Sequence, residues 1–167
     1  MVNKTLNPEP EVNKDGKYGV NIPRSRDTSR ADSVFSGTLR MLDDLGWVCL
    51  TEVSLSNNRR ADILALSRSG DFLIVEVKSS LADFASDGKW PEYLDWCDHF
   101  AFAVDGDFPQ EKIPEDAGLI IADGFGGAFL RETAPVKLAA ARRKAMTLKF
   151  ARLAAYRLYR NANAPVA

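Results

Sequence analysis

Apolar residues follow two different spacings in the first half of the chain. From Asp32 to Leu45 they recur every three or four positions and stop at Gly46, which predicts an amphipathic helix. Three apolar segments of strand length come next, separated by short polar turns. They are residues 47–55, a strand that follows the turn at 56–58 and ends near Ser67, and residues 71–80. This order predicts one helix followed by three strands.

The second half of the chain adds helices on either side of further strands. Residues 80–97 have a helical pattern that is broken near 88–91, because proline is tolerated only in the first turn of a helix. A long helix is predicted from Pro135 to about Arg160. The segments between them are a strand at 99–104, a loop at 105–116 and a hairpin of 118–123 with 126–132. The predicted fold class is α/β or mixed α+β, with a central sheet flanked by helices.

Length and composition favour one domain preceded by an arm. The 167 residues are enough to bury a hydrophobic core without disulfides. Residues 1–30 are rich in Asn, Pro, Gly, Lys and Arg and lack periodicity, so we expect a flexible arm followed by a domain over residues 31–162. There is no apolar run near twenty residues and no charged-then-apolar leader, so we expect a cytoplasmic protein without a membrane partner.

The cysteine and histidine content argues against a zinc site. Cys49, Cys97 and His99 are too few to supply a set of thiolate and imidazole ligands. A cytosolic setting also argues against a disulfide. We therefore interpret all three residues as structural.

Charge is distributed unevenly, although the net charge is only -1. Residues 43–132 carry eighteen acidic and seven basic residues, whereas residues 133–167 carry eight basic residues and no acidic residue. An acidic middle followed by a basic C-terminal segment indicates an anionic partner.

The segment DFLIVEVKSS, residues 71–80, holds two charged side chains in an otherwise apolar strand. The preceding loop, Arg68-Ser69-Gly70, has glycine in the position that adopts a left-handed conformation in a common type of hairpin. This loop sets Ser67 opposite Asp71. Counting back along both strands then places Asp62 opposite Glu76.

Side chains alternate between the two faces of a strand, so Asp62, Glu76 and Lys78 are expected on one face. The residues expected in the core on the other face are Leu73, Val75 and Val77. Opposed carboxylates repel each other, so a cation is expected nearby. One candidate is Lys78 itself, in a structural ion pair. The other is a divalent metal such as Mg²⁺, which prefers carboxylate oxygens, with Lys78 then acting on the attacking water or on the phosphate.

The same residues resemble the PD-(D/E)XK nuclease superfamily. The resemblance lies in Asp62, followed after thirteen residues by Glu76-Val77-Lys78, in the order helix, three strands, helix and strand. Ala61 stands where the proline of the superfamily name would be, and that proline is dispensable. Glu52, on the preceding strand, is similar in position to a further acidic residue that many members use.

Longer runs resemble the MmcB family of bacterial DNA-repair proteins over about residues 34–160. The runs are LTEVSLSNNRRADILAL, VEVKSSLADFASDGKWPEYLDWCDHFAFAV, GLIIADGFGGAFLRE and ARRKAMTLKFARLAAYRLYR. The resemblance implies a PD-(D/E)XK-like core and a nuclease role in the bacterial cytoplasm. Because that role follows from the fold, the resemblance alone does not establish an activity.

The resemblance leads to a specific expectation for the site and two alternatives. We expect a DNA-repair nuclease in which Asp62 and Glu76 bind Mg²⁺ or Mn²⁺, Lys78 is catalytic, and the Val77 carbonyl and Glu52 are further metal ligands. DNA is the expected partner, with other repair proteins as additional candidates. One alternative is a module that recognises DNA or recruits a repair partner without cutting. The other is a structural protein with an internal ion pair.

Basic and aromatic residues near the carboxylates are candidates for nucleic-acid contacts. Arg59 and Arg60 precede the Asp62 strand and either contact phosphate or neutralise the acidic residues. Lys89 is a candidate for holding the scissile phosphate. Trp90 and Tyr93 either stack on bases or pack in the core.

The last predicted helix also has a basic side. On a helical wheel its basic arc consists of Arg142, Arg143, Lys149, Arg157 and Arg160. This arc is suited to following a nucleic-acid backbone. Apolar residues interrupt it, however, and the alternative is that the helix lies against the acidic middle of its own chain.

Overall fold

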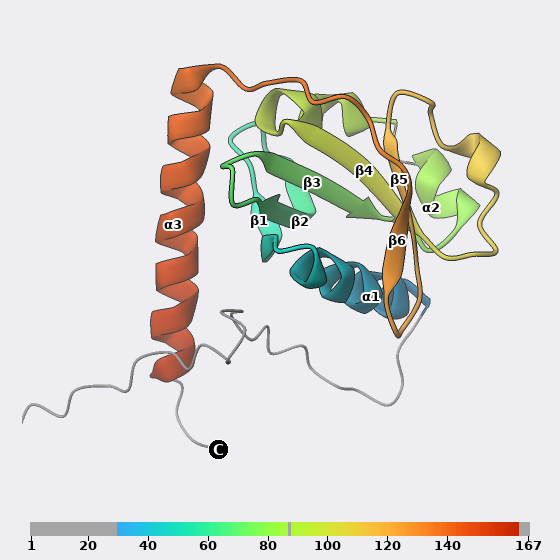
Figure 1. Ribbon diagram of the computed structural model, residues 1–167, viewed down its shortest axis with the longest axis horizontal. Helices are drawn as coiled ribbons and strands as arrows, with labels where there is room; N and C mark the ends of the chain where they lie inside the picture. The colour runs from blue at the N-terminus through green and yellow to red at the C-terminus, as the bar shows by residue number, and fades with distance from the viewer. Residues whose placement is uncertain (1–29, 87, 164–167) are drawn as a thin grey trace, which may run out of the picture.

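The computed structural model describes residues 30–86 and 88–163 and contains one six-stranded sheet flanked by helices (Figure 1). The predicted arm lies outside the described residues, apart from Arg30. The strands are β1 (Val48–Ser54), β2 (Arg60–Leu66), β3 (Phe72–Val77), β4 (His99–Val104), β5 (Gly118–Ala122) and β6 (Gly127–Arg131). The helices are α1 (Arg30–Asp44), α2 (Leu81–Ser86), α3 (Ala140–Ala162) and the 3-10 helices η1 (Trp90–Trp96) and η2 (Gln110–Lys112).

The sheet is mixed, and its strands lie side by side in the order of the sequence. Strands β1, β2 and β3 are antiparallel neighbours, β3, β4 and β5 are parallel, and β6 returns antiparallel to β5. The predicted mixed α+β class is therefore confirmed. The predicted break near 88–91 is also confirmed, because α2 and η1 lie on either side of it. The last helix begins five residues later than predicted, at Ala140 instead of Pro135.

Both faces of the sheet are covered, which explains why β3 is apolar along most of its length. One face packs against α1 and includes Leu73 and Val75. The other face includes Phe72 and Ile74 and packs against η1 and the first half of α3. The prediction that Leu73, Val75 and Val77 point into a core was correct. It was incomplete, because the face that carries Glu76 is a second core and not an open surface.

Helix α3 is held to the domain by the buried carboxylate of Asp98, the residue immediately before β4. The Asp98 carboxylate accepts hydrogen bonds from the backbone of Phe72 at 2.8 Å and of Leu138 at 3.0 Å, and it pairs with Arg143 of α3. Burial alone would raise the pKa of Asp98, but Arg143 and the two backbone donors outweigh it, so the pKa lies below its usual range. One side chain thus joins β3, the segment before α3, and α3 itself.

No helix within the described ranges is long and apolar enough to cross a membrane. The 23 residues of α3 are the longest helical segment, and its basic side chains interrupt any apolar stretch.

Helix α1 packs very closely against the turn between β5 and β6 at Gly37. A β-carbon at this position would overlap the carbonyl oxygens of Asp123 and Gly126. The Arg40 side chain, one turn later, donates to the carbonyl of Gly124 in the same turn. Since glycine within a helix is less stable than alanine by about 0.5–1 kcal/mol, its place here is explained by the close approach.

We expect Gly37→Ala to lower the free energy of unfolding by at least about 2 kcal/mol, because the added methyl group overlaps backbone atoms that cannot move independently. Urea unfolding followed by circular dichroism measures the change. Gly106→Ala is the matched control, since a β-carbon there meets no atom within 4 Å. An equal stability for Gly37→Ala and the parent protein would contradict this packing.

Candidate active site

The two carboxylates predicted to face each other do so at the open end of the β2–β3 hairpin. The observed register pairs Ile63 with Val75 and Leu64 with Ile74, so Asp62 and Glu76 are the next opposed pair. The predicted register is therefore confirmed. It was set by the turn, where Gly70 has a left-handed φ of 85° and the Ser67 amide bonds to the Asp71 carbonyl at 3.0 Å.

Beyond Ile63 and Val75, side chains replace the backbone pairing. The Val77 amide donates to Oδ2 of Asp62 at 2.9 Å, and the Asp62 amide donates to Oε1 of Glu76 at 3.3 Å. Each carboxylate therefore receives a backbone N–H group from the opposite strand. These two hydrogen bonds tie both acidic side chains to the backbone of the hairpin.

Glu76 and Lys78 are deeply buried, with exposed fractions of 4% and 5%. Nζ of Lys78 lies 3.7 Å from Oε2 of Glu76, which is an ion-pair distance but longer than a normal hydrogen bond. Asp62 is only partly buried, because it lies at the end of the hairpin. The site therefore has a buried pair, Glu76 with Lys78, beside a carboxylate that solvent can reach.

The protein environment raises the pKa of both carboxyl groups of this pair above their usual values in water. Burial, followed by repulsion from Asp62, raises the pKa of Glu76 to about 7, although Lys78 acts in the opposite direction. Burial is also the main reason that the pKa of Asp62 is raised, while the Val77 amide and Lys78 lower it. Two carboxylates that resist ionisation together form a site in which an added cation would be stabilised.

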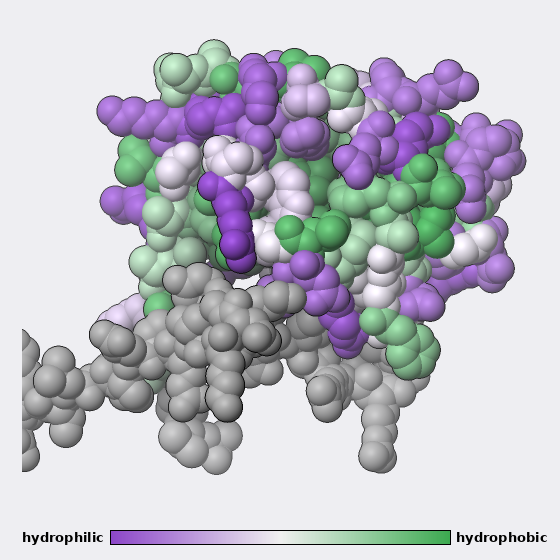
Figure 2. Space-filling view, viewed as in Figure 1, coloured by the Kyte–Doolittle hydropathy of each residue, from purple (hydrophilic) through white to green (hydrophobic). Residues whose placement is uncertain are grey.

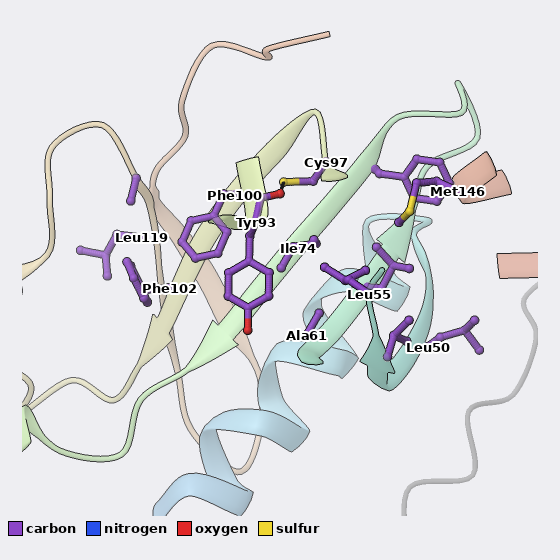
Figure 3. Close-up of a cluster of buried hydrophobic side chains, with 14 of the residues drawn as sticks. Leu50, Leu55, Ala61, Ile74, Tyr93, Cys97, Phe100, Phe102, Leu119 and Met146 are labelled. Atoms are coloured by element: carbon purple, nitrogen blue, oxygen red, sulfur yellow. Dashed lines mark hydrogen bonds between the residues drawn. The ribbon is translucent and has the colours of Figure 1, made fainter. Parts of the chain in front are cut away.

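Tyr93 has a role that the sequence did not predict. Its ring is buried and stacks on Phe100, with centroids 5.8 Å apart, so it has no free face for a nucleic-acid base. Its hydroxyl donates to the Arg60 carbonyl at 3.0 Å and is near enough to Glu76 to lower the pKa of that carboxyl slightly. Figure 3 shows the ring among the core residues, with the hydroxyl directed toward the Ala61 end of β2. Tyr93 is thus a positioning residue for the site, and the packing alternative was correct for its ring.

Trp90 also belongs to the core and not to a stacking surface. Its ring stacks on Phe100 at 5.3 Å and meets Phe102 edge-on at 6.0 Å. Neighbouring Lys89 is exposed, just before η1. The aromatic residues of this segment therefore join η1 to β4, and only Lys89 among the three predicted contacts is directed to solvent.

Glu52 and Asp62 occupy the positions between the Thr51–Ile63 and Val53–Ala61 pairs of β1 and β2, and the charge of Glu52 contributes to the raised pKa of Asp62. The φ of Glu52, 51°, is left-handed, and the alternation of β1 is interrupted there, because Leu50 and Val53 both join the same core cluster. Its carboxylate pairs with Nε of Arg60 at 2.6 Å. Over residues 30–86 and 88–163, no three His, Cys, Asp or Glu side chains are grouped closely enough to hold a metal ion.

The carbonyl of Val77 is oriented suitably for the predicted third ligand. In a β-strand the N–H and C=O groups of one residue point to the same side. The Val77 amide points toward β2, where Asp62 accepts its hydrogen, whereas the Lys78 amide points toward Ala103 of β4. The Val77 carbonyl is therefore directed to the side of Asp62.

Most of the predicted nucleic-acid contacts already have partners within the chain. Arg59 forms a two-pronged ion pair with Glu92, at 2.8 and 2.9 Å, and Arg60 pairs with Glu52. The basic residues on α3 differ in their surroundings. Arg143 pairs with Asp98, Arg142 lies over the ring of Trp96 at 4.0 Å, and Lys149 lines a groove beside α3. For Arg143, the structure agrees with the alternative that this helix lies against acidic residues of its own chain.

The raised pKa of Glu76 gives a pH dependence that can be measured. We expect the free energy of unfolding in EDTA to fall by about 2–3 kcal/mol between about pH 5 and pH 8. The reason is that native Glu76 retains a proton up to a pKa of about 7, whereas the unfolded chain has already released it. Glu76→Gln should lose most of this decline, as measured by urea unfolding at several pH values.

Glu115→Gln, which changes an exposed carboxylate in another loop, should keep the decline of the parent protein. If the free energy of unfolding of Glu76→Gln fell with pH as steeply as that of the parent protein, the proton responsible would be bound to a group other than Glu76.

Comparison with known proteins identifies the family. The chain is similar over 82% of its length, with 39% sequence identity and a TM-score of 0.77, to the structure of a protein of unknown function from Silicibacter pomeroyi, 94% of which is covered. Among curated proteins, none matches the chain. Residues 20–165 match a family described as DNA repair protein MmcB-like, which is most of the sequence. The chain therefore belongs to the MmcB-like family of DNA repair proteins.

Proposed function

We propose that the protein is a metal-dependent nuclease that hydrolyses DNA phosphodiester bonds during repair. The observation that carries this proposal is the convergence of Asp62, Glu76 and Lys78 at the open end of one hairpin, with both carboxylates held by backbone amides. Membership of a DNA-repair family supports DNA as the substrate. Neither Cys49 nor Cys97 is a candidate nucleophile, because burial raises the pKa of each thiol to about 12.

The donor set fits Mg²⁺ or Mn²⁺. Such ions take one or two protein carboxylates and complete their coordination with waters and substrate phosphate. Asp62, Glu76 and the Val77 carbonyl would hold the ion. Glu52 would contribute only after release from Arg60. When bound, the ion would supply Lewis-acid activation of the phosphate and a more acidic bound water.

The residues of the chain have distinct tasks in this proposal. Asp62, which is the more accessible carboxylate, faces the substrate side of the site. Glu76 must release its proton to act as a ligand, so its pKa of about 7 favours function at neutral to slightly alkaline pH. The Lys78 ammonium, held 3.7 Å from Glu76, is placed to stabilise negative charge on the phosphate. Tyr93, on the core side, lowers the pKa of Glu76 and so favours the ionised form that would bind the metal.

A second candidate function is DNA binding without cleavage, on the same fold. The observation that favours it is the burial of Glu76 and Lys78, at 4% and 5% exposed, in which the lysine already occupies the place of a neutralising cation. A protein of this kind would keep its affinity for DNA when either residue is replaced. The two candidates therefore differ in their response to substitution and to metal.

Incubation with single-stranded, duplex, flapped and lesion-bearing DNA, with Mg²⁺ or Mn²⁺, tests the proposal. We expect cleavage of at least one of these DNAs and its loss in EDTA. Asp62→Asn, Glu76→Gln and Lys78→Met should each slow cleavage by at least about 100-fold, since each removes a ligand or a charge that acts in the transition state.

The exposed Glu115→Gln substitution is the control and should leave cleavage unchanged. Cleavage that persists in Asp62→Asn or Lys78→Met would come from a contaminant or from another site. If no DNA is cut while all variants bind DNA equally well, the binding function replaces the nuclease.

A further inference from the structure

A groove of about 860 Å³ runs between α3 and the edge of the sheet at β1. In Figure 1, α3 stands beside the β1–β2 end of the sheet and extends past it. Strand β1 contributes Ser54 to one wall, the turn after β1 contributes Ser56, and η1 contributes Trp96. The other wall is a face of α3. In Figure 2, the surface over α3 alternates between hydrophobic and hydrophilic side chains.

The groove is positively charged. Lys149, Arg152 and Arg157 line it, and Glu52 is its one acidic lining residue within the described part of the chain. The Glu52 carboxylate is paired with Arg60, so it offsets little of the charge that α3 supplies. The charge of Arg143, by contrast, is taken up by Asp98 outside the groove. An anionic occupant is therefore favoured over a second copy of α3, which would bring like charges together.

Aromatic rings in the walls narrow the choice of anion. Trp96 lines the groove, and Arg142 covers one face of the Trp96 ring. Tyr156 also lines the groove, and 58% of this residue is exposed. Bases stack on exposed aromatic rings only when they are unpaired, and a basic groove beside such rings is typical of single-strand binding. Duplex DNA offers phosphates but hides its base faces.

Strand β1, which borders the groove at Glu52 and Ser54, also pairs with β2, the strand that carries Asp62. An Arg157 nitrogen donates to the Thr51 carbonyl at 2.6 Å and lies 3.5 Å from the Glu52 carbonyl. These contacts fix the distance between α3 and the strand. Glu52 and Asp62 occupy the positions between the Thr51–Ile63 and Val53–Ala61 pairs of β1 and β2.

We propose that this groove binds single-stranded DNA, with Lys149 and Arg152 on the phosphates and Tyr156 stacked on a base. The inference rests on the proposed function in taking DNA as the partner. It goes further in assigning an unpaired strand to the α3–β1 groove, and it does not require that the strand be cut.

Fluorescence anisotropy with a labelled oligothymidylate and the full chain in EDTA tests this assignment. We expect the double variant Lys149→Gln/Tyr156→Ser to bind at least about tenfold more weakly, because it loses one phosphate contact and one stacking contact. The slope of log affinity against log salt should also become shallower by about 0.7, the value for one phosphate contact on a single strand.

The matched control is Lys144→Gln/Tyr159→Ser. Lys144 and Tyr159 are exposed residues of α3 that do not line the groove. The control therefore removes one positive charge and one tyrosine ring, as the groove variant does, but outside the groove. It should bind within about threefold of the parent protein. Circular dichroism of both double variants checks that α3 remains folded.

Several results would overturn the assignment. Equal losses in the two double variants would indicate general attraction to α3, and parental affinity in the groove variant would place the strand elsewhere. Tighter binding of a duplex, or of RNA with the same base sequence, would also contradict it. Because the assay contains EDTA, binding by the groove can succeed even if no nuclease activity exists, so the two proposals fail separately.

Discussion

The exchange of hydrogen bonds between Asp62 and the strand that carries Glu76 determines the geometry of the site. Where the backbone ladder between β2 and β3 stops, the Asp62 carboxylate accepts from the Val77 amide and the Glu76 carboxylate accepts from the Asp62 amide. Two groups that would repel each other are thereby held side by side. The same exchange directs the Val77 carbonyl toward Asp62 and leaves Lys78 on the face of Glu76.

This arrangement is tolerable because the sheet is buried on both faces. The core beneath α1 anchors the alternate residues of β3, and the core beneath η1 surrounds Glu76 and Lys78. A buried ion pair is costly unless its members have further hydrogen bonds, and here the Asp62 amide supplies one to Glu76. The core that stabilises the domain therefore also raises the pKa of Glu76 and makes the site favourable for a cation.

The parts of the structure that depend on short-range rules could be predicted from the sequence. The register of the hairpin followed from a three-residue loop ending in Gly70, and the strands followed from their apolar runs. The turn of β1 at Glu52 could not be predicted, because a left-handed residue other than glycine has no clear local signal. The partners of Tyr93 and Arg143 lie 33 and 45 residues away, so only the folded chain brings them together. Basic and aromatic residues consequently looked more available for nucleic acid than they are.

A crystal structure of the wild-type protein soaked in Mn²⁺, at a pH above the pKa of Glu76, shows directly whether the two carboxylates bind a metal ion. We expect an anomalous density peak between the carboxylates of Asp62 and Glu76, within coordination distance of the Val77 carbonyl. An unoccupied site at saturating Mn²⁺, with Lys78 still paired to Glu76, would contradict it. In that case the two carboxylates and the lysine would form a structural ion-pair network.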